Sequence, residues 1–280
     1  MKMLSSPAAS RIALNAPLVL FLALTLVVPL LGIVVFSFGA EPHLFSNYVQ
    51  VVSSRTYMRV IGMTLLLGVI VAATTTALAF LFSLWVLNLP KRWKPVVIAC
   101  IVMPFFISYL VRALSWMPVL GFNGLVNRSL LAMGVIDAPL TLIYNPLAVV
   151  LGTANVLFPV AALPLLAAFH KVDKRLLEAA KSLGASRWTT FKRIFLPLVG
   201  RATLSTLIMV FAIATGFYIT PSVLGGGKVL LAPNLIELLI HRRGEWGSGA
   251  ALSVILLLIF LASIALAKRL GNPRQRRVAR

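Results

Sequence analysis

Few side chains in this sequence have the types and spacing that catalysis requires. The 280 residues include six Asp and Glu, three His and one Cys. The histidines lie far apart in sequence, without a Cys or carboxylate at metal-ligand spacing. The run Gly225-Gly226-Gly227-Lys228 lacks the leading glycine and the following Ser or Thr of a phosphate-binding loop. No carboxylate pair or nucleophile–base set stands out, so the sequence predicts no enzyme, no cofactor and no metal site.

The strongest concentration of charge lies between two apolar segments, in Lys171–Pro197, KVDKRLLEAAKSLGASRWTTFKRIFLP. We call this segment the charged loop. Asp173 can cap a first helix, in which Leu176, Ala180 and Leu183 recur at helical spacing. Gly184 permits the left-handed conformation that ends a helix. The first half of the loop therefore predicts a short capped helix and a tight turn.

The second half of the charged loop predicts a second helix. Ser186 can cap it, and Pro197 is expected to close it. An apolar and aromatic face is formed by Trp188, Phe191, Ile194 and Phe195. Pattern alone leaves two interpretations open: an element that docks a partner, and an amphipathic loop whose apolar face rests on the bilayer.

The composition indicates an integral membrane protein. The chain is 60% hydrophobic and 11% charged, with a mean hydropathy of +0.99, whereas soluble domains are nearer half apolar and a quarter charged. The net charge of +20 comes from cations clustered between apolar runs. Because these cations do not interleave with aromatics in a polar domain, nucleic-acid binding is disfavoured and membrane lipid is the expected partner.

Six apolar runs are long enough to cross a bilayer as helices. We read the first as an uncleaved span, because a signal peptide would have a shorter core and a small residue where Phe38 stands. The predicted spans are 17–38, 60–87, 95–116, 142–169, 202–219 and 250–267. The predicted class is an all-α membrane protein, with a membrane domain over 60–268, a polar N-terminus over 1–16 and a basic tail over 269–280.

The distribution of cations predicts the orientation. The N-terminus, the turn at 89–94, the loop at 170–201 and the C-terminal tail together hold 19 of the 26 Lys and Arg residues. Short loops rich in Lys and Arg stay on the cytoplasmic side. Both termini and the charged loop are therefore predicted to be cytoplasmic, and four of the six acids face outward.

The charged loop resembles the EAA loop of the permease subunits of bacterial ABC importers. The resemblance rests on Glu178-Ala179-Ala180, Gly184-Ala185, Phe191, Ile194 and Leu196-Pro197. It implies a cytoplasmic coupling loop over 170–197 that seats in a groove of an ATPase subunit. The resemblance implies this coupling role for Glu178, Ala179, Ala180, Gly184 and Ala185.

Further segments resemble the spermidine/putrescine branch of that family over most of residues 60–268. They are Pro104–Arg112 through Trp116, Gly124–Asn127, Phe158-Pro159, Leu163-Pro164, Thr220–Gly226, and Trp246 with Gly249–Ser253. The resemblance implies a bacterial inner-membrane importer with a pair of ATPase subunits, a second permease and an extracytoplasmic receptor. Its cargo would be a polyamine, or alternatively an opine, aminoethylphosphonate or another small solute.

A translocation path is expected at aromatic and charged residues of the spans. The candidates are Tyr109, Arg112, Trp116, Phe217 and Tyr218. Their aromatic rings can make cation–π contacts with a polyamine. For Arg112, two interpretations stay open: a role in the path, and a side chain that extends to the lipid headgroups.

Two other classes of protein remain as alternatives. A membrane enzyme would need carboxylates, histidines or nucleophiles within its spans, and a proton-coupled carrier or an independent channel would usually show buried titratable groups. Neither set is visible in this sequence, which favours the importer.

Overall fold

The computed structural model describes residues 7–39 and 43–271, and side chains from residue 15 to 265 except those at 40–42 and Lys174. Within these residues the fold is helical, without a strand. Residues 1–6 and 272–280, which hold much of the predicted basic ends, lie outside the described residues. The chain divides into two compact units, Met1–Met58 with Ile236–Leu258 and Arg59–Leu235 with Ile259–Arg280.

The predicted all-α membrane fold is confirmed. Among the described residues, five helices are long and apolar enough to cross a bilayer, and a bent pair of helices makes a sixth candidate span. The five are Asn15–Ser37, Arg55–Asn88, Pro146–His170, Arg187–Thr215 and Trp246–Ala265. The cytoplasmic placement of the termini stays a prediction.

The first unit contains the N-terminal helices and the beginning of the last one. Its elements are α1 (Pro7–Leu22), η1 (Ala23–Val27), α2 (Val28–Ser37), α3 (Ser46–Ser53), η4 (Leu238–Arg242) and the start of α15 (Trp246–Gly271). The Ser37 hydroxyl lies 2.6 Å from the Tyr48 hydroxyl, and Ser248 Oγ donates to Gln50 Oε1 at 3.1 Å. These bonds connect α3 to α2 and to α15.

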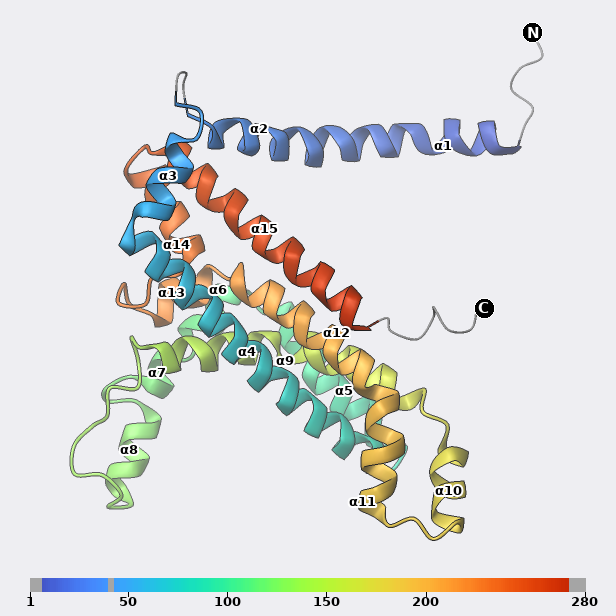
Figure 1. The fold of residues 1–280 in the computed structure, drawn as a ribbon. Helices are drawn as coiled ribbons and strands as arrows, with labels where there is room; N and C mark the ends of the chain where they lie inside the picture. Colours follow the sequence, from blue (N-terminus) through green and yellow to red (C-terminus); the bar gives the residue numbers. More distant parts are fainter. Residues whose placement is uncertain (1–6, 40–42, 272–280) are drawn as a thin grey trace. The chain divides into compact units, whose positions relative to one another are not determined.

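The second unit contains the remaining helices (Figure 1). They are α4 (Arg55–Asn88), α5 (Lys94–Val102), η2 (Met103–Phe106), α6 (Tyr109–Leu114), α7 (Met117–Leu120), α8 (Leu125–Ala132), α9 (Pro146–His170), α10 (Lys174–Ser182), α11 (Arg187–Thr190), η3 (Phe191–Phe195), α12 (Leu196–Thr215), α13 (Ile219–Leu224) and α14 (Ala232–Glu237).

Helix α9 is the centre of the second unit. It is buried over 56% of its most apolar stretch, more than any other candidate span, and it packs against α6, α12 and α13. Small residues allow this close packing. A Cβ atom on Gly152 would lie 2.8 Å from Thr220 Cγ2 and would also meet the Leu224 side chain, both of α13, so a larger residue here would displace these side chains.

The third predicted span, 95–116, is broken rather than continuous. Its two pieces, Lys94–Phe106 and Tyr109–Ala132, meet at an angle of 103°. Pro104 lies in a 3₁₀ turn, and Ile107 and Ser108 are extended, with ψ of 133° and 138°. Proline removes a backbone donor and clashes with the preceding turn, which accounts for the end of the helix here.

Asn127 holds the irregular segment after this break. It is fully buried. Its Nδ2 donates to the carbonyls of Gly121, Phe122 and Leu140 at 2.9–3.2 Å, and its Oδ1 accepts from Leu140 N at 2.9 Å. One amide side chain therefore satisfies backbone groups on both sides of α8, which would otherwise lie beside it without these partners.

We expect Asn127→Ala to destabilise the protein by about 2–3 kcal/mol, because buried backbone groups lose their partners. The midpoint of thermal unfolding of the purified protein measures this loss. Asn123→Ala, at an exposed position of the same segment, is the matched control and should leave the midpoint unchanged. Equal midpoints for the two variants would contradict the role given to Asn127.

Candidate functional site

The charged loop folds as two capped helices joined by a turn, as predicted. Asp173 Oδ1 accepts from Arg175 N at 2.9 Å at the start of α10. Ser186 Oγ accepts from Thr189 N at 3.1 Å at the start of α11. These short polar side chains satisfy amides that a helix N-terminus leaves open. Both caps were expected from the sequence and both are confirmed.

The turn between the two helices depends on Gly184, whose φ is +81°. Ala185 N donates to Ala180 O at 3.0 Å and Gly184 N donates to Lys181 O at 2.9 Å, which closes the end of α10. This pattern requires the left-handed conformation, which costs other residues about 1–2 kcal/mol. Gly184 therefore sets the direction in which the chain returns.

The predicted end of the second helix at Pro197 is wrong. Helix α11, the π-helical turn η3 and α12 form one continuous span, Arg187–Thr215. Leu196 N bonds to Phe191 O, five residues earlier. The wider turn rearranges the backbone bonding immediately before the proline, so the missing N–H of Pro197 does not stop the helix. The charged loop is thus a direct extension of a spanning helix.

The five residues matched to the EAA pattern differ in exposure. Ala180 is 7% exposed and lies on α10, which packs against α11 and η3. Glu178, Ala179 and Gly184 are exposed, and Ala185 is half-buried. Large apolar side chains are exposed beside them, with Leu183 at 89% and Trp188 at 69%. The loop therefore presents an uncovered surface of small, apolar and acidic residues.

Five rings connect the charged loop to two spanning helices; we call them the aromatic cluster. They are Phe80, Phe169, Trp188, Phe191 and Phe195. Phe191 stacks on Trp188 and on Phe195, at centroid distances of 5.9 and 5.7 Å. Phe169 of α9 meets Phe195 and Phe80 edge to face, at 5.1 and 5.0 Å. The cluster thus anchors η3 to α4 and α9.

The sequence predicted only part of this cluster. The helical spacing of Trp188, Phe191 and Phe195 placed them on one face. Phe80 and Phe169 went unrecognised, because an aromatic residue at the end of an apolar span is equally compatible with contact to lipid. No signal in a single sequence identifies the partner helices of such a ring.

The structure brings together three of the five residues predicted for a path. Tyr109 opens α6 and meets Phe217 edge to face at a centroid distance of 6.0 Å. The guanidinium carbon of Arg112 lies 5.8 Å from the centre of the Tyr109 ring. Phe217 stands in the interruption between α12 and α13. The contact therefore joins two places where spanning helices are broken.

Arg112 is buried without a polar partner. It is 7% exposed, and its Nε, Nη1 and Nη2 have no hydrogen-bond partner in the part of the chain that the structure describes. An uncompensated buried charge costs several kcal/mol, and a cation–π contact returns about 0.5–2 kcal/mol. The side chain does not extend to the surface of the chain, so the interpretation that it reaches headgroups does not describe this structure.

The two remaining path candidates, Trp116 and Tyr218, differ in exposure and in their contacts. Trp116 is half-buried and packs on the core. The Tyr218 side chain is 41% exposed, while its carbonyl accepts from Asn234 Nδ2 at 3.2 Å and from Ser222 Oγ at 2.8 Å. Tyr218 contributes its backbone to the interruption after α12.

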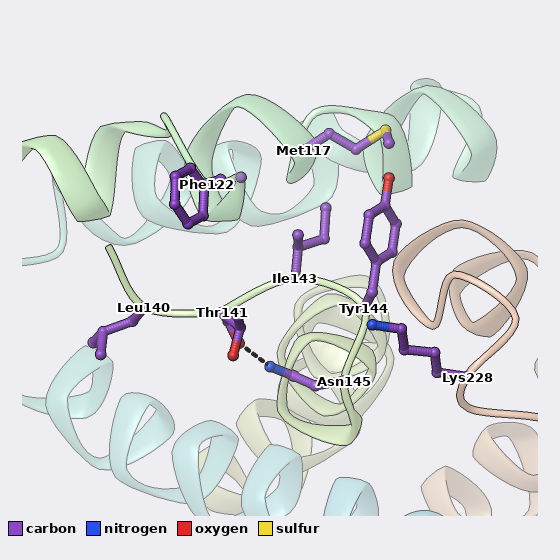
Figure 2. Close-up of a pocket in the computed structure, with 9 residues that line it drawn as sticks. Met117, Phe122, Leu140, Thr141, Ile143, Tyr144, Asn145 and Lys228 are labelled. Atoms are coloured by element: carbon purple, nitrogen blue, oxygen red, sulfur yellow. Dashed lines mark hydrogen bonds between the residues drawn. The ribbon is translucent and has the colours of Figure 1, made fainter. Parts of the chain in front are cut away.

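A cavity of about 440 Å³ lies elsewhere in the second unit, and the sequence did not predict it. Figure 2 shows Tyr144 and Lys228 lining it together, with Asn145 bonded to the Thr141 carbonyl. Tyr144 has a φ of +60°, and its N–H donates to Leu224 O at 3.0 Å. Its side chain is 38% exposed and lies against Gly226, where a Cβ atom would clash with it.

Comparison with known proteins gives one family for almost the whole chain. The family described as "Binding-protein-dependent transport system inner membrane component" matches residues 4–277. The spermidine/putrescine transport system permease protein PotB of Escherichia coli (strain K12) is 32% identical over 213 residues, 76% of this chain and 77% of the relative. PotB of Haemophilus influenzae is 31% identical over 227 residues, 80% of this chain and 79% of the relative.

A solved structure has the same fold at lower identity. It is a bacterial ABC transporter involved in the import of the acidic polysaccharide alginate, with a TM-score of 0.78 at 19% identity over 94% of this chain and 95% of that chain. A second structure of an alginate transporter, in complex with a pentasaccharide-bound periplasmic protein, gives a TM-score of 0.79 over 93% of each chain. Together with the several spans, these matches indicate a multi-pass protein of the bacterial inner membrane. The chain belongs to the binding-protein-dependent inner membrane components, the permease subunits of ABC importers, and within them to the spermidine/putrescine branch.

Proposed function

We propose that this permease converts ATP-driven movement of a partner ATPase into passage of a polyamine across the membrane. The observation that carries the proposal is the continuity of the charged loop with α12, together with its anchorage on α4 and α9 through the aromatic cluster. A loop that served only to rest on lipid would need neither feature.

The charged loop supplies the docking surface. Glu178 and Ala179 are exposed on α10, beside Leu183 and Trp188. Small residues allow another backbone to approach closely, and exposed apolar residues supply area that a partner groove can bury. The partner is the cytoplasmic ATP-binding subunit, working as a dimer. This assignment places the loop and both chain termini on the cytoplasmic side.

Movement of the loop reaches the membrane interior through one helix. The span Arg187–Thr215 has 29 residues, and at 1.5 Å per residue it is about 43 Å long. A displacement of α11 by the ATPase therefore moves α12 up to its end at Thr215. The aromatic cluster provides the support against which this helix tilts.

The remaining partners are those that the importer family implies. A second permease, identical or different, pairs with this chain. An extracytoplasmic receptor supplies recognition of the cargo, because no acid stands within the predicted spans to bind a polyamine. ATP binding and release shift the permease pair between two states, and the cargo contributes only through its different affinity for them.

We expect Glu178→Lys to abolish uptake and receptor-stimulated ATP hydrolysis while the protein still inserts, because a cation replaces the carboxylate on the docking surface. Proteoliposomes with the complete importer measure both activities. Asp137→Lys makes the same change at another exposed acid and should leave them unaltered. Gly184→Asp, which strains the turn, should behave like Glu178→Lys. Normal uptake in both loop variants would refute docking by this loop.

We expect Phe191→Ala to uncouple the importer, because it removes the ring shared by both halves of the aromatic cluster. The ATPase should still co-purify, whereas uptake per ATP hydrolysed should fall about tenfold, within the usual range of coupling free energies. Phe191→Leu keeps much of the side-chain volume, so its uptake per ATP hydrolysed should fall less than that of Phe191→Ala. Unchanged uptake per ATP in Phe191→Ala would show that the cluster carries no movement.

The cargo is tested by uptake of radiolabelled spermidine through the complete importer. We expect uptake that an excess of unlabelled putrescine inhibits, since the relatives named for these two polyamines match most of the chain. If the receptor instead binds an opine or aminoethylphosphonate and spermidine is not taken up, the polyamine assignment is wrong while the importer assignment stands.

A further inference from the structure

The contact between α6 and α13 joins two short helices that both begin at an interruption of a spanning helix, and it lies beside a buried charge. Each helix has six residues, and each follows directly on an interruption of a spanning helix, at Ile107–Ser108 and at Gly216–Tyr218. The Tyr109 and Phe217 rings meet between them. Short segments beside an interruption can turn as units, because the few residues of the interruption absorb the change in backbone angles.

A buried charge lies beside this contact. Each guanidinium nitrogen of Arg112 has less than 1 Å² exposed and no hydrogen-bond partner among the described residues. The guanidinium carbon lies 5.8 Å from the centre of the Tyr109 ring, which itself meets Phe217. Arginine keeps its charge in proteins, so deprotonation offers no relief. The closed contact therefore has an electrostatic cost that parting the helices would remove.

Neighbouring polar atoms are in the same condition. Thr220 of α13 is fully buried, and its Oγ1 has no partner. Thr153 of α9 is 2% exposed, and its Oγ1 likewise has none. Helices α6, α9 and α13 contact one another pairwise. Each of the three helices thus carries a buried side-chain polar atom without a hydrogen-bond partner among the described residues.

We propose that the α6–α13 contact is a gate of the transport path. Arg112 destabilises the closed state of this gate and so lowers the free energy needed to open it. When α13 moves with the end of α12, water reaches the guanidinium and hydrates it. The charge thus favours the open state, and the apolar contacts favour the closed state. The proposal rests on the proposed function, because a gate presupposes a transport path.

Arg112 fits this positioning role better than direct recognition of an anionic cargo. Its nitrogens are sealed in the structure, so a solute could reach them only after the gate had opened. The aromatic edge contact between Tyr109 and Phe217 closes the gate by geometry, and Arg112 sets how easily it opens. Neutralising Arg112 should therefore stabilise the protein while slowing transport, a combination that loss of a merely structural residue would not produce.

The test uses cysteine labelling of the complete importer in nanodiscs, in a Cys100→Ala background. Ala113→Cys places a thiol beside Arg112, at a position 1% exposed, and Ala162→Cys places one in the α9 core, at 0% exposed. We expect ATP and loaded receptor to speed maleimide labelling of Ala113→Cys about tenfold, as a shift in open-state population requires. Labelling of Ala162→Cys should not change. Equal rates for Ala113→Cys with and without turnover would overturn the gate.

The role of Arg112 is then separated from the gate itself. Adding Arg112→Met should lower the turnover-dependent labelling of Ala113→Cys about tenfold and leave the thermal midpoint equal or higher, because buried ions replaced by apolar groups often stabilise. Arg112→Lys should keep most of the labelling. Faster labelling together with a lower thermal midpoint in Arg112→Met would mean that Arg112 has an ordinary packing role. Slower labelling of Ala113→Cys, with Arg112 unchanged, in the presence of inorganic phosphate would mean that Arg112 forms an anion site. Either result overturns the proposal.

A crosslink provides an independent measurement. Tyr109→Cys with Phe217→Cys, joined by a short reducible crosslinker, should lower uptake at least about tenfold and recover on reduction. The control pair, Phe82→Cys with Phe158→Cys, replaces rings 5.4 Å apart between α4 and α9 and should transport when joined. Uptake by the joined Tyr109→Cys/Phe217→Cys pair would refute the gate. Absence of receptor-stimulated ATP hydrolysis in the parent importer would instead refute the proposed function.

Discussion

A peptide group in hydrocarbon has no water to bond, so every interruption of a spanning helix needs partners from the protein itself. This constraint governs the second unit. The carbonyl of Tyr218, exposed by the interruption after α12, accepts from Asn234 Nδ2 and from Ser222. Asn127 does the same for the irregular segment around α8. Asn234 and Asn127 thus supply hydrogen-bond partners at two irregular places of the unit.

The same constraint explains why one helix can connect two distant regions. Because Arg187–Thr215 is continuous, its backbone N–H and C=O groups are paired along the whole span, and bending the helix would break some of these hydrogen bonds. The charged loop at one end and the Phe217 interruption at the other belong to the same rigid element. The aromatic cluster adds a fixed support near the loop, because edge-to-face rings lose contact when they slide.

The sequence predicted those parts of the site that depend on local chemistry. Asp173, Gly184 and Ser186 each act on residues within five positions, so their roles are legible in one segment. Pro197 was misread because its effect depends on the π-helical turn before it, which has no sequence signature of its own. The break at Ile107 was likewise missed, although Pro104 stood nearby. Contacts such as Phe80 with Phe169 join distant segments, and one sequence without its relatives does not reveal them.

The π-helical turn at Phe191–Phe195 also acts as an inserted residue in the register of the helix. One residue corresponds to about 100° of rotation around the axis of an α-helix. The turn therefore sets the azimuth at which α10 and its exposed Glu178 project from α12. Without it, the same sequence of caps and helices would present its acidic and small residues to a different side. A single extra residue in a helical repeat thus decides which neighbour the loop can meet.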